Sequence, residues 1–420
     1  MLTQEENKRL TEVSRGTPMG ELLRRYWLPV AGLAELEDEP TKAVRLLGED
    51  LVLYKDLNGV LGLLGLHCPH RKASLEYGIP EQNGLRCCYH GWLFDHEGHC
   101  LEQPAEPPES TFKDRVRHTA YPVQELGGLV WAYLGPDPAP LLPRYDVFVW
   151  GDAIRDIGRA EIACNWLQCM ENSVDLTHVD HLHGYYYNYV LQKQGRPSRP
   201  AGQRVYGGAR HTKIGFEVFD HGIRKKRLLE GGSEDSATWR DGTNPIVFPN
   251  MTRGGGAGSM QIRVPIDDYR TRFYLYSCYR PAKGVTVPPQ QRPPVYQVPF
   301  VQPNGKFATD WITGQDVMVM VTQGPILDRT DEKLGVSDEG IIFYRKVLGE
   351  QIDRVQRGED PLGVIRDPEK NQIIELKPGE RATRVGFMDN HWHQFSPIYA
   401  EARALILEGL GEPKRSDGDR

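Results

Sequence analysis

Alternating apolar and polar residues in short runs begin near residue 42 and predict a β-rich domain. Residues 44–47 and 51–54 flank a Gly-Glu-Asp turn, which predicts a hairpin. Residues 60–66 and 129–134 have the same character and predict two further strands. Three prolines between residues 136 and 140 mark the end of this domain.

Two capping patterns precede the β-rich domain and predict two short helices. Thr3 followed by Glu6 fits a capping box, and Thr17 followed by Pro18 fits an N-cap with proline at the first helical position. We therefore expect a helical lead-in over residues 1–41 and an all-β domain over residues 42–140.

The pattern changes again beyond residue 140, where strand-like and helix-like segments both occur. Five segments predict an antiparallel sheet: 215–220, 223–229, 245–249, 261–264 and 271–279. Helices are predicted at about 165–183 and from 337 to Gly358. The second domain, 141–410, is therefore expected to be α+β, and the polar segment 411–420 to be a frayed tail.

Composition excludes several classes of protein. The 420 residues carry a formal net charge of -6, which gives no electrostatic reason to expect nucleic-acid binding. No apolar run is long enough to span a membrane, and the N-terminus lacks the features of a signal peptide. Seven cysteines are too few for a disulfide scaffold, so we expect a cytoplasmic protein with reduced thiols.

Two Cys/His pairs stand out in the first domain: Cys68 with His70, and Cys87 with His90. Both pairs fall in loops at strand ends, where two thiolates and two imidazoles can converge on one metal centre. Two cysteines on one iron and two histidines on the other is the ligand set of a Rieske [2Fe–2S] cluster. A structural zinc accepts the same four residues and is the alternative.

A second group of candidate ligands lies between residues 165 and 183. On a regular helix Glu171, Asp175 and His178 would fall within about 60° of one another, as one polar stripe. Such a stripe is often only a solvated face, but three histidines follow within six residues, at 178, 181 and 183. Two histidines and one carboxylate with open positions are the ligands of a non-haem Fe(II) oxygenase. Spacing alone leaves the second histidine open, since His183 can join His178 only if the helix breaks or widens to a π-type turn.

Together these motifs resemble the oxygenase components of Rieske non-haem iron aromatic oxygenases. Segments 68–71 and 87–92 resemble the family's cluster-binding segments, and 171–183 its mononuclear-iron segment. Residues 16–27 resemble the phthalate dioxygenase branch, and 245–249 and 263–268 resemble 5,5'-dehydrodivanillate O-demethylase oxygenases within it. Cys88 and Lys72 depart from the family pattern without removing a ligand.

The resemblance implies a role for each candidate residue. It selects His178, His183 and Asp316 as iron ligands, although residues 317–321 favour a strand by propensity; Asp310, Asp328 and Asp331 are the alternatives to Asp316. It implies that Asp175 joins the cluster of one subunit to the iron of its neighbour. It also places Asn165 and Glu171 near the iron without binding it.

The resemblance implies an enzyme that uses O2 and electrons from a separate NAD(P)H-dependent reductase or ferredoxin. The lack of an apparent Gly-rich dinucleotide motif after a strand agrees with that expectation. The resemblance further implies a helix-grip catalytic domain and head-to-tail contacts that close a trimer or stacked trimers.

The substrate is expected to be a methoxylated, carboxylated lignin-type aromatic that is O-demethylated. The candidate carboxylate-binding cations are the basic run Arg224, Lys225, Lys226 and Arg227 and the separate Arg204, Arg210 and Lys213. For most of them, a charge on the outer face of a strand is at least as good an interpretation. Ring cis-dihydroxylation of a phthalate-like acid is the alternative reaction. An electron carrier without catalytic iron and a zinc-stabilised binding module are the alternatives of other classes.

Overall fold

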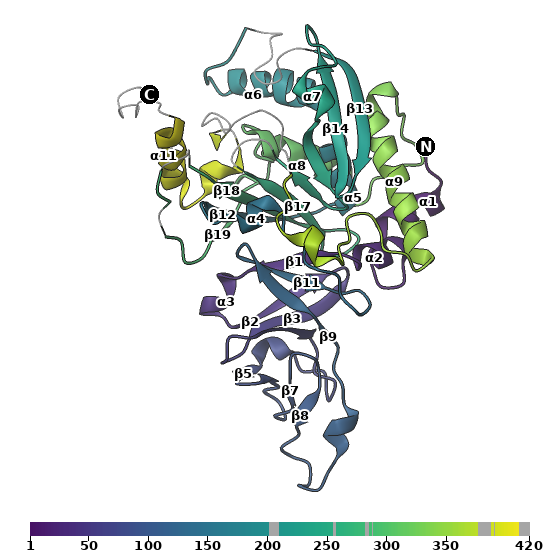
Figure 1. Cartoon of the computed structure of the whole chain (residues 1–420), viewed down its shortest axis with the longest axis vertical. Coiled ribbons are helices and arrows are strands. Elements are labelled where there is room, and N and C mark those ends of the chain that lie inside the picture. The colour runs from purple at the N-terminus through teal and green to yellow at the C-terminus, as the bar shows by residue number, and fades with distance from the viewer. Residues whose placement is uncertain are drawn as a thin grey trace.

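The computed structural model divides into a small β-domain and a larger part built around one long sheet (Figure 1). It describes residues 1–200, 210–254, 258–281, 285–287, 289–376, 388–389 and 391–410. The predicted tail, 411–420, lies outside the described residues. The α+β class and the division into an all-β part and a sheet-and-helix part are confirmed.

Three small antiparallel sheets form the β-domain. Their strand orders are β2-β3-β4-β9, β5-β6-β7-β8 and β1-β11-β10. The strands are β1 (Trp27–Gly32), β2 (Thr41–Leu46), β3 (Glu49–Lys55), β4 (Leu61–Gly65), β5 (Ile79–Glu81), β6 (Gly84–Arg86), β7 (Leu93–Phe94), β8 (Cys100–Glu102), β9 (Ala120–Tyr121), β10 (Val123–Leu126) and β11 (Leu129–Tyr133). The predicted hairpin is β2–β3, and its turn uses Leu47 and Gly48 at positive φ (49° and 80°), as a tight two-residue turn requires.

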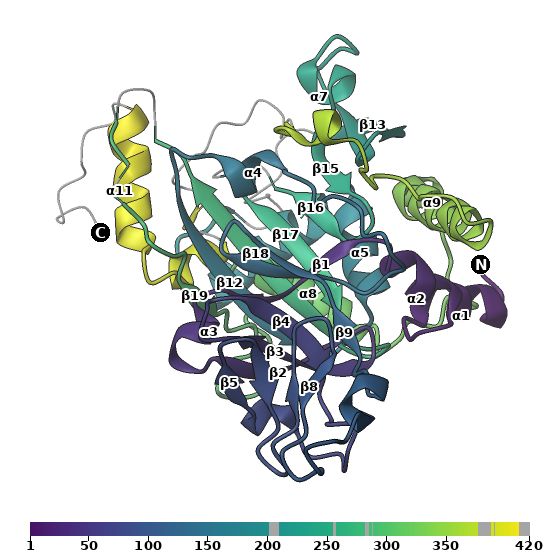
Figure 2. The same ribbon diagram turned by 60° about the horizontal axis from the view of Figure 1, so that its bottom comes forward.

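The helical lead-in was predicted only in part. Helices α1 (Gln4–Thr11) and α2 (Pro18–Leu23) form with the expected caps at Thr3 and Thr17. The segment after them is strand β1, not helix, and it pairs with β11. All six residues of β1 are buried, so the strand lacks the alternation that would have revealed it. Helices α1 and α2 lie against α9 (Glu339–Gln356) of the larger part (Figure 2).

One mixed sheet of eight strands forms the centre of the larger part, in the order β13-β14-β15-β16-β17-β18-β12-β19. All neighbours are antiparallel except β12 and β19. The strands are β12 (Ile154–Ile162), β13 (His211–Phe219), β14 (Gly222–Leu229), β15 (Thr243–Val247), β16 (Met251–Arg253), β17 (Met260–Pro265), β18 (Thr271–Tyr279) and β19 (Val295–Gln297). The five predicted strands are present, whereas β12, β16 and β19 were not foreseen.

Helices surround this sheet. They are α3 (Glu35–Asp38), α4 (Asp146–Val149), α5 (Trp166–Val174), α6 (Tyr187–Lys193), α7 (Ala237–Arg240), α8 (Ile312–Thr322), α9 (Glu339–Gln356) and α11 (Tyr399–Leu410), with the π-helix η3 (Val179–Tyr186). Short 3₁₀ turns are η1 (Leu75–Tyr77), η2 (Phe112–Arg115), η4 (Val336–Asp338), η5 (Pro368–Asn371) and η6 (Trp392–Phe395). Helix α9 ends before Gly358, which has a positive φ of 78°, as predicted.

The two faces of the sheet have different neighbours. Phe273 and Leu275 of β18 pack with Cys169 of α5 and with Val317 and Met320 of α8. On the other face, Tyr276 donates a hydrogen bond to the carbonyl of Gly127 in the β-domain (2.9 Å). The helices α5 and α8 therefore cover one face, and the β-domain lies against the other.

The predicted helix at 165–183 is not continuous. Helix α5 ends at Val174, Asp175 is extended (φ -68°, ψ 119°), and helical structure resumes at His178 as η3. This correction removes the polar stripe, because Asp175 and His178 no longer follow Glu171 on one regular helix. Helix α8 covers residues 317–321 in spite of their strand propensity, because Val317 and Met320 pack in the apolar layer under the sheet.

Candidate metal centres

His178, His183 and Asp316 meet at one point beside the helix-covered face of the sheet. One ligand atom from each lies within 4.8 Å of the other two. Asp316 Oδ1 is 3.1 Å from His183 Nε2 and 3.5 Å from His178 Nε2. Two imidazoles and one carboxylate arranged this way have the donor set of a mononuclear iron site. Their assignment as ligands stays a prediction that the geometry favours.

The π-helix is what brings His183, rather than His181, to this point. On a regular α-helix His178 and His183 would point about 140° apart. The i→i+5 bonding of η3 widens the turn, so residues five apart lie on one side. His181 is exposed, and its ring lies 5.2 Å from that of Tyr185.

The alternative carboxylates are engaged elsewhere. Asp310 pairs with Arg196 (3.1 Å), and Asp328 accepts hydrogen bonds from Thr330 in a turn. Asp331 pairs with Lys333 (2.6 Å) at the surface. Within the described ranges, Asp316 is the only carboxylate grouped with His178 and His183.

Each imidazole of the triad is oriented by a neighbour on its Nδ1 side. Gln315 Oε1 lies 2.8 Å from His183 Nδ1, and the Gln315 amide nitrogen donates to the carbonyl of Thr309 (2.8 Å). Because the amide nitrogen is used there, Oε1 is left to accept a proton from His183 Nδ1, and Nε2 keeps its lone pair for a metal. Asp175 Oδ2 lies 3.5 Å from His178 Nδ1 and favours the same tautomer there.

Asp175 is itself held in place. Its Oδ1 accepts hydrogen bonds from the backbone N–H and the hydroxyl of Thr177 (2.7 and 2.9 Å). Burial alone would lower the pKa of His178, but the carboxylates of Asp175 and Asp316, each 3.5 Å from one of its ring nitrogens, raise it to about 9. Burial would likewise raise the pKa of Asp316, yet the charge of His183 and contacts with both histidines hold it well below its ordinary value. The pocket therefore stabilises positive charge, and a divalent cation would displace protons from it.

Asn172 and Gln315 were missed by the sequence analysis. Asn172 donates to Asp316 Oδ1 (3.3 Å), across the gap between α5 and α8. Gln315 immediately precedes the predicted ligand, and this adjacency was the available signal. Whether the Gln315 side chain faces His183 depends on the tertiary fold, which residue spacing does not reveal.

Asn165 and Glu171 have structural partners rather than contacts with the triad. Asn165 Oδ1 caps α5 through the Leu167 N–H (3.1 Å), and its amide nitrogen donates to the carbonyls of Thr11 (2.9 Å) and Asp268 (2.7 Å). This is the role of a helix cap that also ties α5 to the lead-in.

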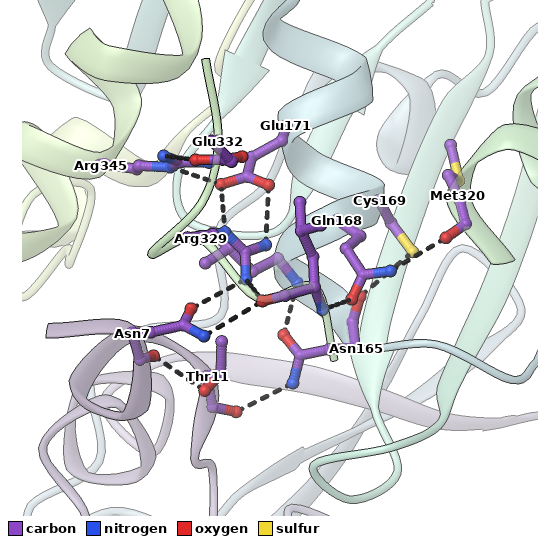
Figure 3. A network of polar contacts seen from close by, with 12 residues as sticks. Asn7, Thr11, Asn165, Gln168, Cys169, Glu171, Met320, Arg329, Glu332 and Arg345 are labelled. Carbon is purple, nitrogen blue, oxygen red and sulfur yellow. Dashed lines mark hydrogen bonds and ion pairs between the residues drawn. The ribbon is translucent and has the colours of Figure 1, made fainter. Parts of the chain in front are cut away.

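Glu171 lies in a buried ion network (Figure 3). Its carboxylate accepts two hydrogen bonds from Arg329 (2.9 and 2.7 Å) and one from Arg345 (2.6 Å). Arg345 also pairs with Glu332, and Arg329 also donates to Asn7 of α1. Burial would raise the pKa of Glu171, but the two guanidinium groups lower it. Glu171 therefore fixes α5, α9 and α1 to one another.

The second donor set lies in the β-domain. Two loops of the same design carry it: Lys72 N–H bonds the carbonyl of Cys68, and Gly91 N–H bonds that of Cys87 (2.9 and 3.0 Å). Lys72 and Gly91 both have positive φ (63° and 74°), so the lysine that departs from the family pattern adopts a left-handed conformation.

The four candidate cluster ligands converge from these loops. Cys68 and Cys87 are 1% and 2% exposed, and the rings of His70 and His90 are 4.5 Å apart at the surface. The His70 ring stacks on Trp92 (4.5 Å). Burial raises the pKa of the Cys68 thiol to about 12, so only a metal would hold it as thiolate. Two buried thiols and two outer imidazoles fit a Rieske cluster.

The structure does not bring three of the predicted substrate cations, Arg210, Lys213 and Arg224, to the triad. Arg204 lies outside the described residues, and Arg210 is exposed. Lys213 pairs with Glu234 (2.7 Å), and Arg224 pairs with Glu217 (3.1 Å). An open cavity of about 620 Å³ adjoins the triad, and none of these cations lines it. Its lining includes Asn172, Asp175, His178, His181, Tyr185 and Tyr186.

Comparisons with known proteins identify the families that this chain resembles. Residues 26–124 match the Rieske [2Fe-2S] domain, and residues 301–376 match the LigXa C-terminal domain-like family. The chain is 42% identical over 379 residues to the 5,5'-dehydrodivanillate O-demethylase oxygenase subunit of Sphingobium sp. (strain NBRC 103272 / SYK-6), covering 90% of this chain and 86% of that protein. It is 33% identical to the phthalate 4,5-dioxygenase oxygenase subunit of Pseudomonas putida, covering 86% and 89%.

Solved structures share the fold. Pseudomonas putida CBB5 NdmA matches with a TM-score of 0.57 at 21% identity, over 80% of this chain and 93% of that chain. The oxygenase in a complex with the ferredoxin of carbazole 1,9a-dioxygenase matches with a TM-score of 0.57 at 20% identity, over 88% and 98%. Across the described residues, no helix is both long and apolar enough to cross a membrane.

Proposed function

Because the chain belongs to the Rieske non-haem iron oxygenase family, we propose that it is the oxygenase component of an aromatic O-demethylase. The substrate class is a methoxylated, lignin-derived aromatic carboxylate, such as a dehydrodivanillate-like biaryl. The observation that carries this choice is the 42% identity, over 90% of the chain, to a protein named for that reaction. The complete two-histidine, one-carboxylate group argues against an electron carrier without catalytic iron.

In this proposal each donor set holds a different metal group. Cys68, His70, Cys87 and His90 would hold the cluster, and His178, His183 and Asp316 the mononuclear iron. When bound, these groups supply one-electron storage and activation of O2. Gln315 and Asp175 keep both imidazoles in the tautomer that presents Nε2, and Asn172 holds the carboxylate of Asp316.

The net reaction consumes one O2, two electrons and two protons for each methyl group. One oxygen atom is inserted into a C–H bond of the methoxy group, and the other leaves as water. In the resulting hemiacetal the bond between the ether oxygen and the former methyl carbon breaks while the new hydroxyl proton moves to the ether oxygen, which gives a phenol and formaldehyde. A separate NAD(P)H-dependent reductase or ferredoxin would supply the electrons.

We propose that electrons cross between subunits of a trimer or of stacked trimers, in a reducing cytoplasm. The loops with His70 and His90 adjoin the sheet β5-β6-β7-β8, which lies at the end of the β-domain away from the large sheet (Figure 1). This position favours electron transfer to the iron of a neighbouring subunit over electron transfer within one chain. Asp175 borders the open cavity beside His178, where a neighbouring imidazole can approach. No disulfide joins the described cysteines, as a reducing compartment favours.

The test is turnover by the reconstituted protein with a surrogate reductase and NADH. The panel consists of a methoxylated biaryl dicarboxylic acid, a methoxybenzoate and phthalate. We expect one formaldehyde and one phenol for each O2 consumed with the methoxylated acids. A cis-diol from phthalate, with no formaldehyde from any methoxylated acid, would replace O-demethylation by ring dihydroxylation, which the 33% identity to a phthalate dioxygenase supports as the second candidate.

A further inference from the structure

Two cations are buried on the face of the large sheet that α5 and α8 cover. Arg263 of β17 is 2% exposed and Lys225 of β14 is 5% exposed. Arg263 lies directly opposite Phe273 of β18, so the two side chains share a face, and Phe273 packs against α5 and α8. The ammonium of Lys225 reaches the same helix layer, where it donates to the carbonyl of Ser173 in α5 (2.5 Å).

Arg263 differs from every other buried arginine in the described part of the chain. Each of the others has a carboxylate oxygen within ion-pair distance: Arg24 with Glu49, Arg253 with Asp146, and both Arg329 and Arg345 with Glu171. Arg263 has hydrogen bonds only to Gln261 on its own strand, one to the side chain (2.5 Å) and one to the backbone carbonyl (3.3 Å). Its Nε has no acceptor, and its guanidinium lies over the Phe273 ring at 4.7 Å.

Lys225 also lacks a carboxylate partner among the described residues, since its single hydrogen bond there is to the neutral carbonyl of Ser173. Burial, together with the positive charges of Arg227 and Arg263, lowers the pKa of Lys225 to about 7. Burial also lowers the pKa of Arg263 to about 10. Two buried cations that repel each other and lack a counter-ion are unfavourable unless an anion joins them.

The two cations reach the helices that carry the triad. Lys225 donates to the carbonyl of Ser173, which follows Asn172, the donor to Asp316. Arg263 lies over Phe273, which packs with Val317, the residue after Asp316. Thr252 of the neighbouring strand β16 lies opposite Gln261, on the same face as Arg263, and its buried hydroxyl has no hydrogen-bond partner among the described residues. One face therefore offers two cations and one hydroxyl donor between the sheet and the helices that carry the triad, and none of the three lines the open cavity.

We propose that Arg263 and Lys225 bind the carboxylate of the aromatic substrate and so set its orientation toward the triad. This rests on the proposed function, because it assigns a substrate group to that same site. It keeps Lys225 from the predicted basic run of β14, adds Arg263, and sets aside Lys213 and Arg224, which are already paired with glutamates.

The experiment measures binding by calorimetry, using the iron-loaded protein without reductase. The probes are a methoxylated biaryl dicarboxylic acid and its dimethyl ester, which has the same shape without the charges. We expect Arg263→Met and Lys225→Met each to weaken binding of the acid by about 30-fold or more and to leave binding of the ester within about threefold. Arg263→Lys should recover part of the affinity for the acid.

Lys226→Met is the matched control, since Lys226 neighbours Lys225 on the same strand but pairs with Glu217. It should bind both probes as the unmodified protein does. Equal losses for acid and ester in the Arg263 and Lys225 variants would overturn the proposal, because these residues would then only shape the site. If a methionine variant does not fold, the unmodified protein decides: binding the ester as tightly as the acid also overturns it.

The binding experiment and the turnover experiment can fail independently, because binding needs no turnover. Binding that depends on the substrate's charge, with no formaldehyde formed in the turnover experiment, would retain the carboxylate site and reject O-demethylation. Formaldehyde production with no preference for acid over ester in binding would retain O-demethylation and reject the carboxylate site.

Discussion

Gln315 Oε1 lies 2.8 Å from Nδ1 of the His183 imidazole. Asp316, the residue that follows Gln315 in α8, contacts the other nitrogen of the same ring, Nε2, at 3.1 Å. The second turn of α8 therefore holds His183 at both nitrogens, and Gln315 is completely buried. One short stretch of helix thus supplies a candidate ligand and also fixes the tautomer of another.

Replacing Gln315 should weaken iron binding without touching a ligand. In Gln315→Leu the His183 Nδ1 proton loses its acceptor, so the ring is free to rotate or change tautomer. We expect iron affinity to fall about 10- to 100-fold, measured by chelator competition. Gln315→Glu keeps an acceptor at this position and should retain iron. The cluster spectrum serves as the control for folding, and an unchanged iron affinity in Gln315→Leu would contradict this role.

Replacing the histidines should separate the two metal centres. The unmodified protein should contain about three irons and two acid-labile sulfides per chain. His178→Ala or His183→Ala should lose about one iron and all turnover while the visible spectrum of the cluster is kept. His181→Ala is the control, because that side chain is exposed and lies against Tyr185. Iron loss in His181→Ala, with iron retained in His183→Ala, would reverse the choice of ligand.

Asp175→Asn should slow electron transfer between the centres. The amide has nearly the same size but lacks the charge that orients His178 and an imidazole from a neighbouring subunit. We expect full cluster and iron contents, normal reduction of the cluster, and at least about a tenfold slower transfer to the iron in single-turnover kinetics. Thr177→Val tests the support of Asp175 and should have a smaller effect, since it removes one of two hydrogen bonds to Oδ1. Transfer at the normal rate in a fully loaded Asp175→Asn protein would remove Asp175 from the path.

Strand β18 has the predicted bounds although eight of its nine residues are buried, because its aromatic residues and threonine favour a strand. Strand β1 is also buried along its whole length, but its six residues include Pro29 and Gly32, which are unfavourable in strands. Neither alternation nor composition therefore revealed β1. Helix α8 shows the opposite limit, because the β-branched residues after Asp316 favour a strand locally and burial in the helix layer decides otherwise.

The candidate site was predictable as a set of residue types but not as a geometry. Spacing left the second histidine open, and the choice depended on the π-helix, which forms in tertiary context. Density of charge in the sequence pointed to the cations between Arg204 and Arg227. The structure instead distinguishes paired cations, such as Arg224, from Arg263, which has no carboxylate partner among the described residues. Pairing across strands and helices cannot be counted from a linear sequence.

Glu171 should contribute to stability rather than to metal binding. Glu171→Ala leaves Arg329 and Arg345, whose side chains are 0% and 6% exposed, without their shared carboxylate. Removing one partner of a buried ion pair costs about 3–5 kcal/mol, although Arg345 keeps Glu332 and will lose less than Arg329. We expect a clear fall in the thermal midpoint, with iron bound as before at low temperature. Asp331→Ala is the matched control, since it breaks a highly exposed pair with Lys333 and should leave the midpoint unchanged.

The same network should make stability fall in acid. The pKa of Glu171 is lower in the folded protein than its ordinary value of 4.5, so its stabilising effect is complete above that value and is lost as pH falls toward the folded pKa. The difference in thermal midpoint between the unmodified protein and Glu171→Ala should therefore be constant near neutrality and shrink below about pH 4.5. A difference that does not change between pH 7 and pH 4 would mean that the carboxylate contributes packing and not charge.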